Sequence, residues 1–407
     1  MNAFFHPAFR WYFLTNTLSL LGNWILKVSL GWFTWQLTQS TFWTSVVALG
    51  VLAPAGVLGP LFAVFAENWD MRRASLLAKG MMLLTTLAIL VLEMGGLHNL
   101  YTLVVLSLLL GLFSALYHPV RLVFITLVVP KESLASAIGL NSVSWNASRV
   151  VGPGLAGLCI SLFGLKISFA VCLLLFLPLL VVLVFLPLSA RASGSETSDG
   201  QQPVGFAERF RQGGRAALES PVIVGCLVMV VVNSFFVRGV LEIQPAIIGQ
   251  VLGGDSTDLA LATIAAGIGA LLSSLWIGSG RLSGAGMGSM LMPMLISGLL
   301  ATMLLGFTGN REIICALFAI SGFTTTVVGI GAQSIIQLEV ADAFRARVMT
   351  WWSSLSFASL TLGGIIIGLL GDLLASIQTA LLMVVIPGMA VAAAINSLKQ
   401  LIAGSAR

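Results

Sequence analysis

Five charged side chains interrupt otherwise apolar stretches of the sequence, and these residues are the best suited to do chemistry. They are Lys27, Arg121, Arg149, Arg238 and Glu242. Arg238 and Glu242 are four residues apart, so they lie on one face of a helix and can pair with each other. A carboxylate in a low dielectric beside a cation can alternate between an ion-paired and a protonated state. Glu242 is therefore the candidate group for proton coupling.

Each of these charges also has a structural interpretation, which the sequence leaves open. A charge in the middle of an apolar membrane helix costs about 2.5–3.5 kcal/mol, so it is normally paired. Lys27 shares a helical face with two asparagines, and it either faces a ligand or forms a salt bridge between helices. Arg238 and Glu242 form either a switching pair or a static one. Pro245, just beyond them, predicts a local break in the helix.

The overall composition indicates which medium surrounds these residues. Of the 407 residues, 58% are hydrophobic and 9% are charged, and the mean hydropathy is +1.03. Soluble domains carry roughly 25% charged residues. The composition therefore excludes a soluble globular protein, a disordered protein and a coiled coil, and predicts a polytopic membrane protein. The four cysteines lie in apolar runs without CxxC spacing, so no disulfide, metal site or cofactor is predicted.

The elements that must position the charges are membrane-spanning helices, each of which needs about 20 apolar residues. Six candidate stretches precede a polar interruption and six follow it. The stretches are 11–36, 41–66, 74–95, 99–129, 133–162 and 165–189, then 220–250, 258–279, 286–308, 312–338, 343–371 and 374–398. A weak internal repeat, in which residues 130–157 align with 340–368, supports two related halves. The predicted fold is all-α, with twelve transmembrane helices in two six-helix bundles, residues 1–190 and 220–407.

The polar interruption and the positive charges predict the orientation. Residues 191–219 are typical of a cytoplasmic linker that ends in a short amphipathic helix on the membrane surface. Lys and Arg collect on cytoplasmic loops, and twelve spans with both ends in the cytoplasm satisfy that rule. The cytoplasmic side then receives Arg10, Arg72, Arg73, Lys79, Lys131, Arg191, Arg209, Arg211, Arg215, Arg281, Arg345, Arg347, Lys399 and Arg407, and the other side Lys166 and Arg311. This bias explains the net charge of +5 without nucleic acid. The N-terminal segment is too short for a cleaved signal peptide, so the first stretch is expected to be retained.

Several motifs make the sequence resemble the major facilitator superfamily of transporters, and most of all the branch with the enterobactin exporter and macrolide efflux pumps. AVFAENWDMRRASLL resembles the G-x-x-x-D-R-x-x-R-R loop, with Glu67 where the family has Asp and Arg72–Arg73 as its basic pair. Ala63 and Asn68 depart from that motif. NASRVVGPGLAG is similar to the glycine–proline signature of exporters, and YHPVRLVFITLVVPKESLASA and QLEVADAFRARVM are close to the pattern of the branch.

The resemblance implies roles for named residues. In that fold, the first helix of each three-helix unit lines a central cavity, so the cavity candidates are Asn16, Asn23, Lys27, Asn233, Arg238 and Glu242. The motif acid and an arginine latch the inward gate in that family, which implies a gate made of Glu67, Asp70, Arg72, Arg73 and Arg121. Arg149, Gly152, Pro153, Gly154 and Gly157 correspond to the exporter signature and form either a hinge or seal, or a simple packing surface. Trp24 and Trp32 either stack on an aromatic ligand or serve in packing.

The function implied is secondary active export of a small organic molecule, siderophore-like or drug-like, in exchange for protons by alternating access. Two cavity cations against one acid favour an anionic or polar aromatic substrate. We expect a monomer in the bacterial cytoplasmic membrane, surrounded by lipid. An importer or proton symporter of the same fold is one alternative, and a non-transporting scaffold is another, favoured by Ala63 and Asn68. An enzyme is not expected, because no GxSxG, Walker or HExxH motif occurs.

Overall fold

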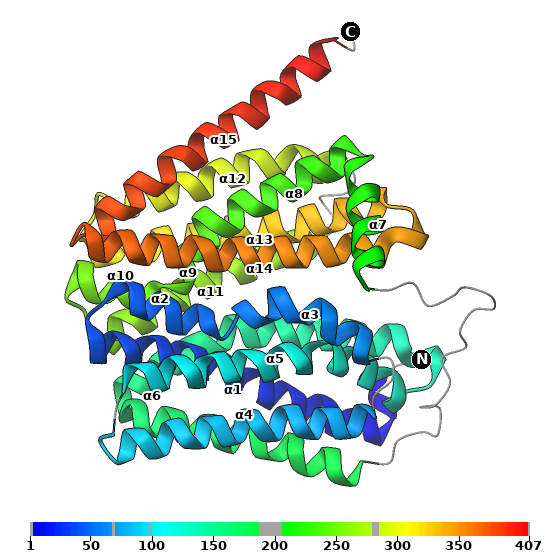
Figure 1. Ribbon diagram of the computed structural model, residues 1–407, viewed down its shortest axis with the longest axis vertical. Helices are drawn as coiled ribbons and strands as arrows, with labels where there is room; N and C mark the ends of the chain where they lie inside the picture. The colour runs from blue at the N-terminus through cyan, green and yellow to red at the C-terminus, as the bar shows by residue number, and fades with distance from the viewer. Residues whose placement is uncertain (1–2, 67–69, 98, 187–205, 279–284, 406–407) are drawn as a thin grey trace.

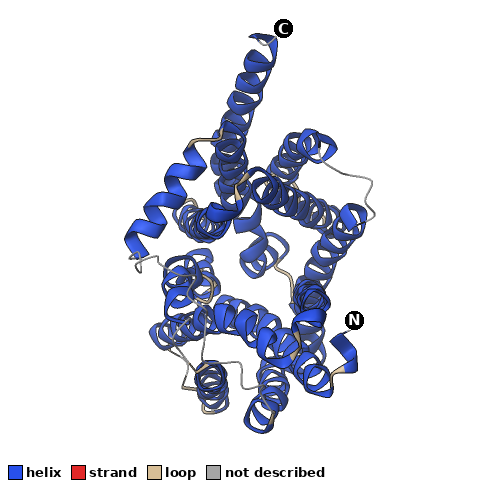
Figure 2. Ribbon diagram, turned by 90° about the vertical axis from the view of Figure 1, so that its right-hand side faces the viewer, coloured by secondary structure: helices blue, strands red, loops and turns tan. Residues whose placement is uncertain are grey.

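The computed structural model describes residues 3–66, 70–97, 99–186, 206–278 and 285–405, and these residues form helices joined by short loops (Figure 1). Fifteen α-helices follow one another: α1 (Pro7–Thr38), α2 (Thr41–Gly50), α3 (Ala53–Ala66), α4 (Met71–Met94), α5 (Leu100–Val128), α6 (Leu134–Phe185), α7 (Phe206–Leu218), α8 (Pro221–Asn233), α9 (Gly239–Glu242), α10 (Gln244–Leu252), α11 (Ser256–Gly278), α12 (Ala285–Leu305), α13 (Arg311–Glu339), α14 (Asp342–Leu373) and α15 (Ile377–Ser405). Short turns η1 (Ala3–Phe5) and η2 (Lys131–Ser133) and the π-helical turn η3 (Ser234–Arg238) complete them. The described part of the chain contains no strand (Figure 2).

The helices are those of a multi-pass membrane protein. The described residues contain ten helical segments that are long and apolar enough to cross a bilayer. Two of the ten run across short breaks: Thr41–Gly59 covers α2 and part of α3, and Pro221–Glu242 covers α8, η3 and α9. One of the ten runs from Ser136 to Phe185 and has 50 residues, more than twice the length that one crossing needs. Gly164 interrupts this helix with φ +82°, a left-handed conformation that glycine adopts without strain. The break falls between the predicted spans 133–162 and 165–189.

Two predicted spans are not continuous helices. The span predicted at 41–66 consists of α2 and α3, separated by a turn at Val51–Leu52 ahead of Pro54, whose ring disfavours helix in the residue before it. The span predicted at 220–250 is divided into α8, η3, α9 and α10. Its break lies at Ile243 and confirms the interruption predicted from Pro245. The count of twelve spans therefore stays a prediction.

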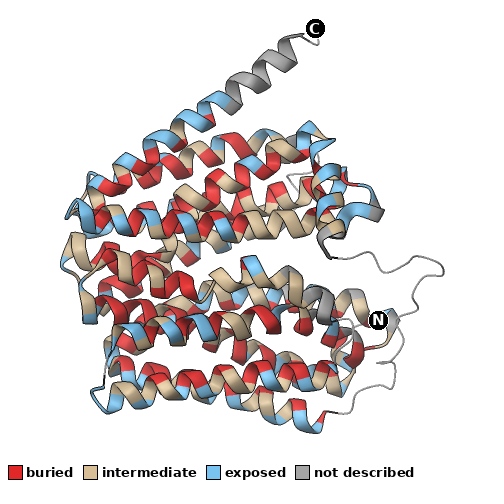
Figure 3. Cartoon of the chain, in the orientation of Figure 1, coloured by how far each residue is buried: buried red, intermediate tan, exposed pale blue. Residues whose placement is uncertain are grey.

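The helices form two groups that meet along their length. Helices α1–α6 lie in one group and α8–α15 in the other (Figure 1). Buried residues face the interior of each group and the surface where the groups meet, and exposed residues lie on the outside (Figure 3). Many exposed side chains are large and apolar, including Leu84, Val91 and Phe185. An apolar exterior of this kind suits hydrocarbon rather than water.

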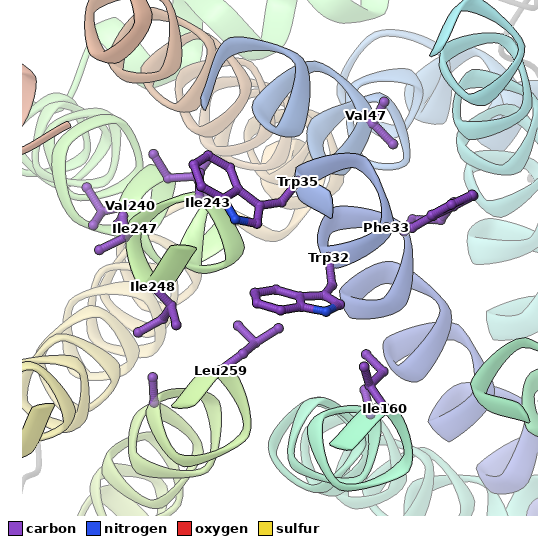
Figure 4. Close-up of a cluster of buried hydrophobic side chains, with 14 of the residues drawn as sticks. Trp32, Phe33, Trp35, Val47, Ile160, Val240, Ile243, Ile247, Ile248 and Leu259 are labelled. Atoms are coloured by element: carbon purple, nitrogen blue, oxygen red, sulfur yellow. The ribbon is translucent and has the colours of Figure 1, made fainter. Parts of the chain in front are cut away.

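A single hydrophobic cluster joins the two groups. Trp32 and Trp35 from α1 are almost fully buried against Ile247 and Ile248 from α10 and Leu259 from α11 (Figure 4). Trp35 is so close to α10 that a Cβ atom on Gly249 would lie only 1.8 Å from its Nε1. The cluster therefore fastens α1 to the second group.

Small residues allow the other contacts between the groups. A Cβ atom on Gly157 of α6 would lie 2.4 Å from Cα of Ala260 in α11. On α14, a Cβ atom on Gly368 would lie 2.7 Å from the carbonyl oxygen of Thr41 in α2. Helix backbones can approach this closely only where side chains are absent.

At one end of the molecule, a carboxylate from the second group caps a helix of the first. Asp372, at the end of α14, accepts hydrogen bonds from the backbone N–H of Thr41 (2.7 Å), from its hydroxyl (2.7 Å) and from the N–H of Phe42 (3.3 Å). The hydroxyl of Ser40 donates to it as well. These bonds satisfy N–H groups that the first turn of a helix leaves without partners. We use the name Asp372 latch for this set of contacts.

The amphipathic helix predicted within 191–219 is present as α7. It packs on the start of α14, where the rings of Phe210 and Trp351 stack at 4.2 Å. Trp351 donates from Nε1 to the carbonyl of Phe210 (2.8 Å), and Arg347 donates to the side chain of Gln212 (2.6 Å). The helix is therefore attached to the second group. Residues 187–205 of the predicted linker lie outside the described residues.

The Asp372 latch predicts that its removal shifts the equilibrium between conformations. Replacing Asp372 by Ala removes a helix cap, which is worth about 1 kcal/mol, or a factor of about five in population. We expect the state separated at this end to gain that factor. Spin labels at Gln36 and Leu374 in a cysteine-free background would report it as a longer distance component.

Asp255→Ala is the matched control, because Asp255 caps α11 within one group, accepting from the N–H of Thr257 (2.8 Å) and of Asp258 (3.1 Å). These backbone donors, with that of Asp258 foremost, hold the pKa of Asp255 below its ordinary value. The control should leave the distance between the labels unchanged. An equal shift in both variants would contradict a latch between the groups.

Candidate functional site

A cavity lies between the two groups of helices, and its wall contains three cations and one acid. The cavity has about 910 Å³ of empty space, including the part open to solvent. Its charged lining residues are Lys27 from α1, Arg149 from α6, Arg238 from η3 and Glu242 from α9. These side chains therefore converge from both groups on one space.

The central interaction is an ion pair between Lys27 and Glu242. Their side chains are 8% and 13% exposed, so the pair is largely shielded from solvent. It joins α1 to α9 and thus the first group of helices to the second. Lys27 forms a salt bridge between helices, which was one of its two interpretations, and it also lines the cavity. Contact of Lys27 with a ligand stays a prediction.

The predicted pairing of Arg238 with Glu242 is wrong. Arg238 donates to the hydroxyl of Ser356 on α14 (3.0 Å) and lies 5.9 Å from the ring centroid of Phe357. Spacing along one helix identified a possible partner for Glu242, but it could not show that α1 presents Lys27 from across the interface. The turn that carries Arg238 is π-helical, and such turns occur frequently at functional sites.

Arg149 lies in the cavity wall together with Pro153. The glycines of the exporter-like motif make close packing contacts: Gly152 lies against Trp24, Gly154 against Ile264, and Gly157 against Ala260. These contacts are the packing surface that the sequence left open as an alternative. The hinge or seal role of the segment stays a prediction.

Three predicted cavity residues lie elsewhere. Asn16 accepts from the hydroxyl of Tyr117 (2.9 Å) and Asn23 accepts from Nζ of Lys79 (3.4 Å), both within the first group. Asn233 donates to Thr325 (2.8 Å), and it is Thr325 that lines the cavity. Asn16 and Asn23 share a helical face with Lys27, but α4 and α5 cover that face, so only Lys27 reaches the space between the groups.

Lys79 is a buried cation among the residues that the sequence assigns to the cytoplasmic side. Its side chain has no exposed surface. Its ammonium lies 4.3 Å from the ring centroid of Tyr117 and 5.2 Å from that of Phe176, in addition to Asn23. The overlooked signal is its place two turns inside the helix Met71–Met94, with apolar residues following.

The predicted gate residues are partly described. Glu67 lies outside the described residues. Asp70 caps α4 by accepting from the N–H groups of Arg72 (2.9 Å) and Arg73 (3.2 Å). Arg72 donates to the carbonyls of Val184 (3.4 Å) and Leu186 at the end of α6, where helix carbonyls lack partners.

Arg121 is buried, and its guanidinium lies 4.6 Å from the ring centroid of Trp145. Its pairing with Glu67 therefore stays a prediction.

The cavity wall also contains residues that charge patterns do not indicate. Thr263 from α11 and Thr325 and Thr326 from α13 contribute hydroxyls, and Trp24 contributes an aromatic surface. Trp24 was one of two tryptophans expected either to stack on a ligand or to pack, whereas Trp32 belongs to the hydrophobic cluster between the groups. Within the described ranges, no group of three or more His, Cys, Asp or Glu residues could hold a metal ion.

The whole sequence matches one known family. The transmembrane secretion effector family of the major facilitator superfamily matches residues 1–406. The chain belongs to this family. It is accordingly a membrane-embedded transporter of small molecules, and not an enzyme.

Individual relatives agree with that assignment. The chain is 23% identical over 387 residues to the enterobactin exporter EntS of Shigella flexneri, covering 92% of this chain and 88% of EntS. It is 25% identical over 341 residues to the uncharacterized MFS-type transporter YfiS of Bacillus subtilis, covering 82% and 79%. The crystal structure of the nucleoside transporter NupG has the same fold, with a TM-score of 0.75 at 12% identity, covering 96% of this chain and 98% of NupG.

The ion pair predicts a characteristic pattern of stabilities. Lys27→Met or Glu242→Gln alone leaves the other charge buried without its partner, which costs about 3–5 kcal/mol. The double variant removes both charges, so it should be more stable than either single variant. Thermal unfolding of the detergent-solubilised protein measures this order.

The pair Arg211–Glu208 (2.6 Å) is the matched control, because its side chains are 59% and 36% exposed and both residues belong to α7. Surface pairs contribute about 0–1 kcal/mol, so removing its partners should have small, additive effects. Additive losses at Lys27 and Glu242 as well would show that the two side chains act independently.

Proposed function

We propose that the chain exports a small organic anion in exchange for protons, by alternating access around the cavity between its two halves. The halves are residues 1–190 and 220–407, six spans each, joined by a cytoplasmic linker at 191–219. Both termini then lie in the cytoplasm, and the protein acts as a monomer in the bacterial inner membrane. The observation that carries this proposal is the ion pair of Lys27 with Glu242 inside the cavity.

The ion pair supplies a way to couple a proton to the change of conformation. While Glu242 is ionised, its attraction to Lys27 holds α1 against α9. A proton on Glu242 removes that attraction, so the halves separate more easily at this point. In the proposed cycle, Glu242 takes up a proton when the cavity faces outward and releases it inward when the pair forms again.

The charges of the cavity favour an anionic substrate. Lys27 and Glu242 neutralise each other, while Arg149 and Arg238 are not paired with any carboxylate among the described residues. Cations in a low dielectric require an anion nearby. Trp24 adds a surface on which an aromatic ring can stack. The export direction is supported by the family and by the relative EntS, whose name describes an exporter.

Everted membrane vesicles with an imposed pH gradient test the proposal. Catechol siderophores, macrolides and cationic dyes are added in turn, and the dissipation of the gradient is followed. We expect one anionic or polar aromatic class to dissipate it, and Glu242→Gln to reduce this response at least tenfold, because the group that carries the proton is lost.

Glu312→Gln is the matched control, since Glu312 is an exposed carboxylate in the first turn of α13. It should leave the response intact. Uptake of the compound by intact cells would favour a symporter instead. A gradient that no compound dissipates, with intact protein in the membrane, would favour the non-transporting scaffold.

A further inference from the structure

The charged groups of the cavity indicate how many charges the substrate carries, in addition to their sign. Of its four charged groups, Lys27 and Glu242 form one neutral pair. Arg238 has the hydroxyl of Ser356 as its hydrogen-bond partner, and in the described part of the chain no acid lies within salt-bridge distance of Arg149. The empty site therefore carries two positive charges that the described residues do not neutralise.

The two arginines belong to opposite halves. Arg149 projects from α6 in the first half, and Arg238 from η3 in the second. A ligand that meets both guanidinium groups bridges the halves, as the Lys27–Glu242 pair does. Guanidinium binds a carboxylate through two parallel hydrogen bonds, so each arginine matches one carboxylate.

We propose, building on the function above, that the substrate is an organic dianion whose two carboxylates or equivalent acidic groups meet Arg149 and Arg238. Its export is then driven chiefly by the membrane potential. A monoanion leaves one buried guanidinium without a counter-charge, and a cation meets repulsion from both.

The driving force follows from the charges that move. A bacterial membrane is negative inside, so an exported anion moves along the electrical gradient. Each charge that crosses 100 mV changes the equilibrium concentration ratio roughly fifty-fold, whereas one proton crossing a gradient of one pH unit changes it tenfold. A dianion leaving while one proton enters transfers three charges in the favourable direction. The potential therefore outweighs the pH gradient.

A series of benzene carboxylates tests the charge of the substrate. The purified full-length protein in nanodiscs is titrated with benzoate, with phthalate and isophthalate, and with the cation benzamidine. We expect a dicarboxylate to bind at least tenfold more tightly than benzoate, and benzamidine not to bind. Arg149→Gln should reduce this preference below threefold, because one of the two guanidinium groups is lost.

Lys166→Gln is the matched control, because Lys166 is an exposed cation just after the break in α6. It should retain the full preference. Equal affinity for benzoate and both dicarboxylates, or binding of none of the carboxylates, would overturn the proposed dianion site.

Proteoliposomes separate the potential from the pH gradient. A potassium diffusion potential of 100 mV, set with valinomycin at equal pH on both sides, should raise the accumulation of the tighter-binding dicarboxylate at least tenfold. Accumulation that follows the pH gradient and ignores the potential would overturn this inference while leaving proton exchange intact. Failure of both gradients would contradict the proposed function itself.

Discussion

The ion pair between Lys27 and Glu242 is the interaction on which the arrangement of the two halves depends. It places opposite charges from α1 and α9 in a space that is mostly apolar, where neither is stable alone. The surrounding contacts keep the two charges together: the cluster of Trp32, Trp35 and the isoleucines of α10 packs one helical turn beyond the pair. The same interaction thus fixes the position of α1 and defines one wall of the cavity.

The remaining contacts between the halves rely on close backbone approach and on hydrogen bonds. Gly157 and Gly368 let helices meet without interlocking side chains, and the Asp372 latch adds hydrogen bonds at one end. Such surfaces separate at lower cost than an interdigitated core, since no large side chain has to leave a pocket. These contacts therefore fit closely without interlocking large side chains, as the proposed alternating access requires.

The sequence predicts the architecture better than it predicts the site. Long runs of apolar residues locate the helices, and Pro245 locates the break at Ile243. Both features depend on the local sequence alone. The partner of Glu242 was not predictable, because it comes from a helix more than 200 residues earlier. Arg149 belongs to a motif that indicates packing or a hinge, and its place in the cavity wall is visible only in the assembled structure. Side-chain direction across an interface was thus the missing information.

Lys79 has a consequence for how the protein is made. Its ammonium is enclosed by Asn23 from a helix that precedes it and by Tyr117 and Phe176 from helices that follow it. These partners become available in the order of the chain. Asn23 precedes Lys79, whereas both aromatic rings are made after it, so of the three contacts only the one between α4 and α1 can form before α5 and α6 are present.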